Sequence, residues 1–223
     1  MTPRSAPGLA LIFDMDGVMV DSYPVHRKAW EVFNRRFGLE TTAAMVERNF
    51  GKRNDDIVRE FFGEGLPAEE VAARSAAKEE LFRQMVSGRT EELLVPGLRD
   101  FLERHRCSPM AVASNAEPEN VALLLDETGL RRCFQAVVDG YQVSLPKPHP
   151  EIYRRAAELL GVPPARCVVF EDSPAGVAAG RAAGMAVIGI RTTHGSLPGT
   201  DLTVDDFLNR DLDAWLDARS RVV

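Results

Sequence analysis

The sequence contains little cysteine and no long apolar run. Its 223 residues include three cysteines, Cys107, Cys133 and Cys167, which lie far apart and form no C-x-x-C pair. Separated cysteines in odd number indicate reduced thiols rather than a disulfide framework or a zinc site. No stretch approaches the roughly 20 apolar residues of a membrane span, and residues 1–8 lack the apolar segment of a signal peptide. We therefore expect a cytoplasmic protein with no membrane partner.

The sequence also lacks the excess of basic residues that polyanion-binding proteins carry. It has 27 Lys and Arg against 33 Asp and Glu, and a formal net charge of -6. This balance argues against nucleic acid or an anionic membrane as the main partner, but a local site can still accept a small anion. Repeats and low-complexity segments are absent from the sequence. A chain of this length buries a sizeable core without disulfides, and we expect a monomer.

Short apolar runs that end in polar residues recur along the chain. Continuous apolar runs favour strands buried on both faces, as in a parallel sheet. Helical patterns, begun or ended by Pro and Gly, separate the later runs. The predicted strands are residues 9–13, 110–113, 136–138, 167–170 and 186–190, and the helices between them are residues 96–106, 118–128, 149–160 and 173–183. This alternation predicts an α/β fold with a Rossmann-like open parallel sheet.

The segment after the first strand interrupts this alternation. It contains no strand-like run, and helical patterns cover residues 24–37, 43–49, 55–62 and 67–86. Ligands of open α/β sheets bind at the carboxyl ends of the strands, so an all-helical insertion here would cover that edge as a cap. We predict an α/β catalytic core of residues 1–19 and 93–223 and a helical cap domain of residues 20–92.

The polar residues that end the apolar runs should meet at one edge of the sheet. They are Asp14, Asp16, Ser114, Asn115, Glu171 and Asp172, with Lys147 in a nearby loop. Four ionised carboxylates and one lysine carry a large negative charge, which requires a divalent cation or protonation away from water. Oxygen ligands without His or Cys suit Mg²⁺. The sequence thus predicts a Mg²⁺ site.

This set of residues is suited to phosphoryl transfer. Mg²⁺ and Lys147 would offset charge on the phosphoryl oxygens, and the hydroxyl of Ser114 would donate to one of them. An ionised Asp14 can attack phosphorus and form an aspartyl-phosphate. Asp16, two residues further on, can protonate the leaving oxygen and later deprotonate the incoming one.

Four motifs resemble those of the haloacid dehalogenase-like superfamily. They are Phe13-Asp14-Met15-Asp16-Gly17-Val18, Ala113-Ser114-Asn115, Lys147-Pro148 and Glu171-Asp172-Ser173-Pro174-Ala175-Gly176. One Asp-x-Asp alone would be weak, but the four occur in order, with suitable spacing, over about residues 9–192. The helical insert resembles the cap of the subgroup that contains β-phosphoglucomutase and many small-molecule phosphatases.

The resemblance implies a role for each motif residue. Asp14 would be the nucleophile, Asp16 the acid/base, Ser114 a ligand of the phosphoryl oxygen, and Lys147 a stabiliser of charge there. The implied Mg²⁺ site consists of Asp14, the main-chain carbonyl of Asp16, Asp172 and, in support, Glu171. The dehalogenases that name the superfamily lack the second Asp and need no metal, so Asp16 favours phosphoryl transfer over carbon–halogen cleavage.

The cap carries weaker signals. The resemblance implies substrate contacts at Asn115, His26, Lys52 and Arg53, although His26 can equally be a satisfied helix histidine and the two basic residues solvated charges. Lys78-Glu79-Glu80 is expected on a solvated face.

A mutase must hold a second phosphate, usually with a cap arginine. Asn54 stands at that position here, and Ala116-Glu117 stands where the mutase pattern carries a lysine. We therefore expect a phosphatase that acts on a small phosphorylated metabolite, such as a sugar phosphate. A β-phosphoglucomutase-like phosphomutase is the alternative.

Overall fold

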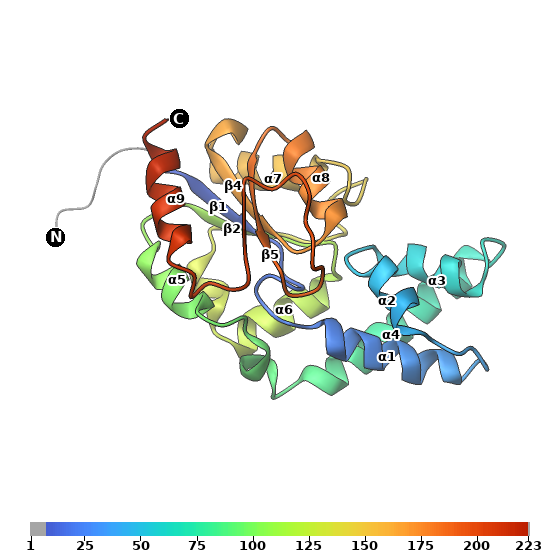
Figure 1. Ribbon diagram of the computed structural model, residues 1–223. Coiled ribbons are helices and arrows are strands. Elements are labelled where there is room, and N and C mark those ends of the chain that lie inside the picture. Colours follow the sequence, from blue (N-terminus) through green and yellow to red (C-terminus); the bar gives the residue numbers. More distant parts are fainter. Residues whose placement is uncertain (1–7, 223) are drawn as a thin grey trace.

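The core of the protein is an open parallel sheet (Figure 1). The structure is a computed structural model that describes residues 8–222; residues 1–7, which the sequence analysis assigns to the core, lie outside the described residues. Within the described range the sheet has the order β3-β2-β1-β4-β5-β6, and all neighbouring strands run parallel. The strands are β1 (Ala10–Phe13), β2 (Met110–Ala113), β3 (Ala136–Val138), β4 (Cys167–Glu171), β5 (Ala186–Ile190) and β6 (Leu202–Val204). The α/β fold expected from the sequence is confirmed.

Helices cover both faces of this sheet. They are α5 (Leu98–Arg104), α6 (Pro118–Glu127), α7 (Glu151–Leu160), α8 (Pro174–Ala182) and α9 (Asp211–Ser220). Side chains of β1 alternate between the faces, because successive residues of a strand point in opposite directions. Leu11 and Phe13 pack with residues of α5, α6 and α9, whereas Ala10 and Ile12 pack with residues of α7 and α8. The sheet is therefore buried on both faces, as its continuous apolar runs predict.

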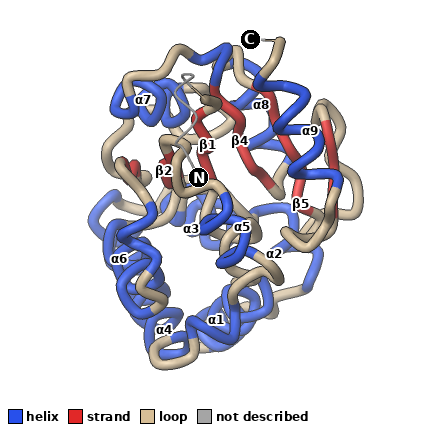
Figure 2. The backbone as a smooth tube through the Cα atoms, turned by 90° about the vertical axis from the view of Figure 1, so that its left-hand side faces the viewer, coloured by secondary structure: helices blue, strands red, loops and turns tan. Residues whose placement is uncertain are grey.

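The insert between β1 and β2 is all-helical, as expected. It contains α1 (Tyr23–Arg35), α2 (Ala43–Asn49), α3 (Asn54–Phe62) and α4 (Ala68–Val86), which enclose an apolar cluster of their own around Trp30 and Phe33. Figures 1 and 2 show α1 and α4 side by side, away from α7 and α8. The two crossings between core and insert are adjacent, because Val20 pairs with Leu94 and the Asp21 N–H donates to the Leu93 carbonyl at 2.8 Å. The boundaries at residues 19/20 and 92/93 stay a prediction.

Two elements near the C-terminus have no counterpart in the sequence-based expectations. Strand β6 is three residues long and only its last residue is fully buried, and α9 buries only Leu212 and Leu216. Short 3₁₀ helices also occur at Thr90–Leu93, Leu130–Cys133 and Pro164–Arg166. None of the helices described within residues 8–222 is long and apolar enough to cross a membrane.

Candidate active site

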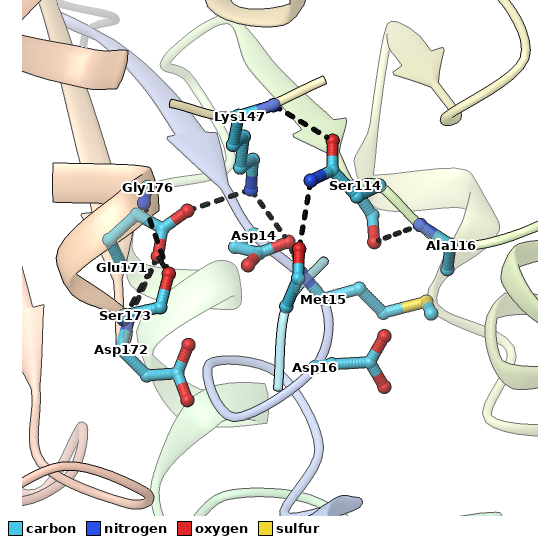
Figure 3. Close-up of polar contacts among 12 residues, drawn as sticks. Asp14, Met15, Asp16, Ser114, Ala116, Lys147, Glu171, Asp172, Ser173 and Gly176 are labelled. Carbon is cyan, nitrogen blue, oxygen red and sulfur yellow. Dashed lines mark hydrogen bonds and ion pairs between the residues drawn. The ribbon is translucent and has the colours of Figure 1, made fainter. Parts of the chain in front are cut away.

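The predicted polar residues meet at the carboxyl edge of the sheet (Figure 3). Asp14 directly follows β1, Ser114 follows β2, and Glu171 ends β4. The backbone amide of Asp14 donates to the Phe170 carbonyl at 3.0 Å, and that of Ser114 donates to the Val138 carbonyl at 3.0 Å. These bonds continue the sheet by one residue, so the side chains that follow each strand are held by the backbone of its neighbour.

Lys147 joins the loop after β3 to this edge. Its Nζ lies 3.0 Å from Asp14 Oδ1 and 2.7 Å from Glu171 Oε1, and its side chain is 2% exposed. Burial opposes the charged form of lysine, but the two carboxylates outweigh burial and raise the pKa of Lys147. The ammonium therefore remains charged and is shared between Asp14 and Glu171.

Glu171 is held on all sides. In addition to Lys147, the hydroxyls of Tyr153 and Ser173 and the backbone amides of Asp172 and Ser173 donate to its carboxylate. Burial alone would raise the pKa of Glu171, but Lys147 and these donors outweigh burial and lower it. A side chain at position 176 would collide with the same carboxylate, so Gly176 is required here. This arrangement fits the supporting role that the resemblance implies.

Asp172 is the least satisfied group of the site. Its Oδ2 is buried and has no hydrogen-bond partner among the described residues. Burial, followed by the charges of Glu171 and Asp14, raises the pKa of Asp172 well above its usual range. A side chain at Gly17, whose φ is +75°, would collide with this carboxylate. The loop after β1 can therefore approach Asp172 only with glycine at position 17.

Three carboxylates of the site can share a cation. Asp14, Glu171 and Asp172 each offer an oxygen, and these oxygens lie within 4.8 Å of one another. A buried carboxylate oxygen without a donor is costly unless a cation or proton satisfies it. The donor set consists of oxygens alone, which suits a hard divalent cation. The residues present thus fit a metal site of the predicted kind.

The pKa of Asp14 is strongly raised. Burial, together with the charges of Glu171 and Asp16, outweighs Lys147 and raises the pKa of Asp14 to about 8. Its Oδ1 also accepts a 2.7 Å hydrogen bond from the Met15 amide. A bound cation would favour the ionised form of Asp14 by adding a second positive charge beside Lys147.

Asp16 is turned toward the helical insert rather than toward this cluster. The Ser22 hydroxyl donates to its Oδ1 at 2.6 Å, and His26 Nε2 lies 3.5 Å from the same atom. Burial acts to raise the pKa of Asp16, but His26 and Ser22 outweigh burial and lower it. Figure 3 shows the Asp16 side chain apart from that of Asp172. The predicted role of the Asp16 main-chain carbonyl in metal binding stays a prediction.

The residues predicted to contact substrate have other partners in this structure. Asn115 Nδ2 donates to the Gly51 carbonyl at 2.8 Å. Lys52 Nζ donates to Asn49 Oδ1 at 2.7 Å and lies 3.2 Å from Glu60 Oε2. Asn115, Gly51 and Lys52 all line the same pocket. Substrate contact by Asn115 and Lys52 stays a prediction.

Arg53 binds the core directly. Its guanidinium donates to the carbonyls of Gly140 and Val143 and, at 3.5 Å, to that of Ser144. These carbonyls belong to the loop that leads to Lys147. Arg53 lines the pocket as well, but in this structure its main partners are main-chain oxygens of the core. Its predicted contact with substrate stays a prediction.

The expectation for residues 78–79 is wrong. Lys78 is 1% exposed and Glu79 3% exposed, and both line the pocket. Lys78 Nζ lies 2.7 Å from Glu79 Oε1 and 2.7 Å from His26 Nδ1, and the His26 ring stacks on Phe82. A run of Lys and Glu in an Ala-rich helix suggests a solvated face. Lys78 is seven residues from Val71 and four from Phe82, and Phe82 is four from Val86, so all four lie on one face of α4. This spacing is the feature of the sequence that indicates burial of Lys78.

The motif residues of this site occur in a known family of enzymes. The model of the haloacid dehalogenase-like hydrolases matches residues 9–184, so the chain belongs to this family and is an enzyme. Fructose-1-phosphate phosphatase YqaB of Escherichia coli K12 is 37% identical over 183 residues, 81% of this chain and 95% of that protein. A β-phosphoglucomutase of Mycobacterium bovis is 32% identical over 214 residues, 82% of this chain and 81% of that protein.

A solved structure supports the same relationship. A variant of CbbY from Rhodobacter sphaeroides, in complex with xylulose-(1,5)bisphosphate, matches with a TM-score of 0.78 and 28% identity. The match covers 89% of this chain and 94% of that chain. The family resemblance read from the four motifs is therefore confirmed.

The buried carboxylates should make the cation-free protein sensitive to pH. Asp14 and Asp172 have raised pKa values when folded, so the folded state binds protons that the unfolded chain releases above its ordinary pKa of 3.8. Stability is then present at low pH and declines as pH rises from about 4 to about 8. We expect a loss of several kcal/mol over this range, measured by urea unfolding in EDTA.

Asp172→Asn is the matched variant, because it removes one of the buried charges without changing the shape of the side chain. Its unfolding free energy in EDTA should depend less on pH than that of the wild type. An equal pH dependence in the two proteins would contradict this interpretation of the cluster.

Proposed function

We propose that the protein is a Mg²⁺-dependent phosphatase that hydrolyses a small phosphorylated metabolite, a sugar phosphate, through an aspartyl-phosphate on Asp14. The observation that carries the proposal is that the side chains of Asp14 and Asp16 face different parts of the site. Asp14 lies against Lys147 at the floor of the site, whereas Asp16 is held toward the pocket by Ser22 and His26. One carboxylate is thus placed for nucleophilic attack and the other for proton transfer.

Asp14 would begin the reaction. Its carboxylate oxygen attacks phosphorus, and an oxygen–phosphorus bond forms as the bond to the sugar oxygen breaks. Lys147, 3.0 Å from Asp14 Oδ1, offsets charge on the phosphoryl oxygens. The Ala116 amide donates to Ser114 Oγ at 3.2 Å, which leaves the Ser114 hydroxyl proton for a phosphoryl oxygen. Bound Mg²⁺, held by Asp14, Asp172 and the Asp16 carbonyl with Glu171 in support, would offset further charge on these oxygens.

Asp16 would move the proton in both halves of the reaction. It is ionised in the free protein, because His26 and Ser22 lower its pKa. An arriving phosphate dianion opposes the charged form of a nearby carboxylate and so favours uptake of a proton. Asp16 then gives this proton to the leaving sugar oxygen and takes one from the water that attacks the aspartyl-phosphate. Phosphate is released and Asp14 is restored.

Relatives support the substrate class. YqaB is named a fructose-1-phosphate phosphatase, and the pocket of this chain offers several amide and carboxylate groups to hydroxyls. The β-phosphoglucomutase relative supports a second candidate, a phosphomutase, which would use the same aspartates but return the phosphate to its product. Net release of phosphate separates the two. We also propose a monomeric enzyme of the cytoplasm; all three cysteines are free, which fits a reducing compartment.

Asp14→Asn should abolish turnover without unfolding the protein, because the amide is a poor nucleophile of nearly the same shape. We expect kcat/KM for a sugar phosphate to fall at least about 1,000-fold. Phosphate release and circular dichroism would be measured together. Asp100→Asn, on the exposed side of α5, is the control and should remain active. A folded Asp14→Asn protein that retains turnover would exclude Asp14 as nucleophile.

Removal of divalent cations should also stop turnover. Three buried carboxylates are accompanied by one ammonium, that of Lys147, so a phosphate dianion is repelled unless a cation is present. We expect activity to disappear in EDTA and return when excess MgCl₂ is added, with phosphate release as the measurement. Full activity after exhaustive chelation would count against the metal site.

A further inference from the structure

One wall of the pocket consists of carboxylates and amides rather than cations. Glu79 of α4 and Glu117, which precedes α6, line this part together with Asn54 and Asn120. We call these four residues the carboxylate wall. Glu79 is 3% exposed and the Glu117 side chain is 13% exposed. The wall is made jointly by the cap and the core, so it forms only when the two are in contact.

The carboxylate wall lies away from the reacting aspartates. A chain of contacts leads from Asp16 to Glu79. His26 Nε2 lies 3.5 Å from Asp16 Oδ1, and Lys78 Nζ lies 2.7 Å from both His26 Nδ1 and Glu79 Oε1. Two side chains therefore separate the proposed acid/base from Glu79. A phosphomonoester whose phosphoryl group reaches Asp14 would extend its other end toward this wall.

The negative charge of Glu79 is fixed by hydrogen bonds and ion pairs, whereas burial and the charge of Glu79 raise the pKa of Glu117. Glu79 accepts from Asn54 on one oxygen and from Asn120, at 2.6 Å, on the other. Burial opposes the charged form, but Lys78 and His26 outweigh burial and lower the pKa of Glu79 to about 2. Glu79 is thus ionised at neutral pH and cannot turn away from the pocket without losing three donors.

The cations near the wall already have partners. Lys78 is bonded to Glu79, Lys52 to Glu60, and Arg53 to main-chain carbonyls of the core. Arg83 lies 3.6 Å from Glu117, but it is also bonded to Glu80 and is not among the described residues that line the pocket. The described lining of the pocket nevertheless holds more carboxylates (Asp14, Asp16, Asp55, Glu79 and Glu117) than cations (Lys52, Arg53 and Lys78), so a second anionic group on a substrate would enter a pocket of net negative charge.

Tyr141 lines the pocket near the carboxylate wall. It is 67% exposed. Burial of its hydroxyl, together with the charges of Glu117, Asp55 and Glu119, raises the pKa of Tyr141 to about 12. Glu117 and Asp55, which line the same pocket, thus lie near enough to Tyr141 to act on its hydroxyl.

We propose that the carboxylate wall makes the enzyme selective for phosphomonoesters with an uncharged polyhydroxy leaving group and rejects sugars that carry a second phosphate. Hydroxyls of such a substrate can donate to Glu79 and Glu117 and accept from the amides of Asn54 and Asn120. A second phosphate would instead be placed beside two carboxylates, and like charges in contact oppose binding strongly. This inference rests on the proposed phosphatase function. It also sets the chain apart from CbbY, whose solved complex holds a bisphosphate.

The test compares each sugar monophosphate with its bisphosphate, in the wild type and in two variants that change the charge at position 117. Fructose 1-phosphate is compared with fructose 1,6-bisphosphate, and glucose 6-phosphate with glucose 1,6-bisphosphate, by phosphate release with Mg²⁺ present. The wild type should show a higher kcat/KM for each monophosphate. The bisphosphate-to-monophosphate ratio of kcat/KM should rise about tenfold in Glu117→Gln and about tenfold again in Glu117→Lys. High salt should reduce both increases.

Glu119→Gln and Glu119→Lys are the matched controls. Glu119 is exposed, stands two residues from Glu117 and is not among the described pocket-lining residues. Its variants carry the same charge changes and should alter the ratio less than about threefold, because solvent screens an exposed charge. Thermal melts would verify that all four variants fold. Equal effects at the two positions, or a wild type that prefers bisphosphates, would overturn the proposal.

Failure of the proposed function is distinguishable from failure of the carboxylate wall. If no sugar phosphate is hydrolysed, the phosphatase proposal fails, and selectivity is then measured as the dissociation constants of the same ester pairs. Monophosphates should still bind at least about tenfold more tightly than their bisphosphates. If esters are hydrolysed or bound without this discrimination, only the carboxylate wall proposal fails.

Discussion

The shared ammonium of Lys147 is the interaction on which the site depends. It contacts Asp14 and Glu171, while Asp172 stands beside them with a buried oxygen that has no hydrogen-bond partner. One positive charge cannot balance three buried carboxylates, so the site favours a cation or a proton. Burial, together with this imbalance, raises the pKa of Asp14 and of Asp172. The site therefore suits an anionic substrate only after a cation is bound.

The cap and the core meet through polar contacts around the pocket. Asn115 bonds the Gly51 carbonyl, Arg53 bonds carbonyls of the loop before Lys147, and Asn120 bonds Glu79. Each contact has a modest net free energy because water can replace it when the surfaces separate. Such an interface can open to admit substrate and close to exclude water. Specificity then depends on residues that both parts contribute, as in the carboxylate wall.

Much of the core and its motif residues could be predicted from the sequence. Apolar runs identified strands β1 to β5, and parallel order placed Asp14, Ser114 and Glu171 at one edge because the carboxyl ends of parallel strands coincide. Strand β6 and helix α9 were missed, since their sequences bury too few residues to produce a clear pattern. The sequence alone places Lys78 and Glu79 in solvent, because the pairing that stabilises these buried charges involves His26, Asn54 and Asn120, which are distant in sequence. The partners of Arg53 could not be predicted either, because they are main-chain carbonyls, which every residue carries whatever its side chain.

The stereochemical course at phosphorus tests the proposed role of Asp14 most directly. A sugar phosphate made chiral with oxygen isotopes would be hydrolysed in isotopically labelled water, and the configuration of the released phosphate determined. Attack by Asp14 followed by attack of water involves two in-line displacements, so overall retention is expected. Inversion would show a single displacement by water and would contradict an aspartyl-phosphate intermediate.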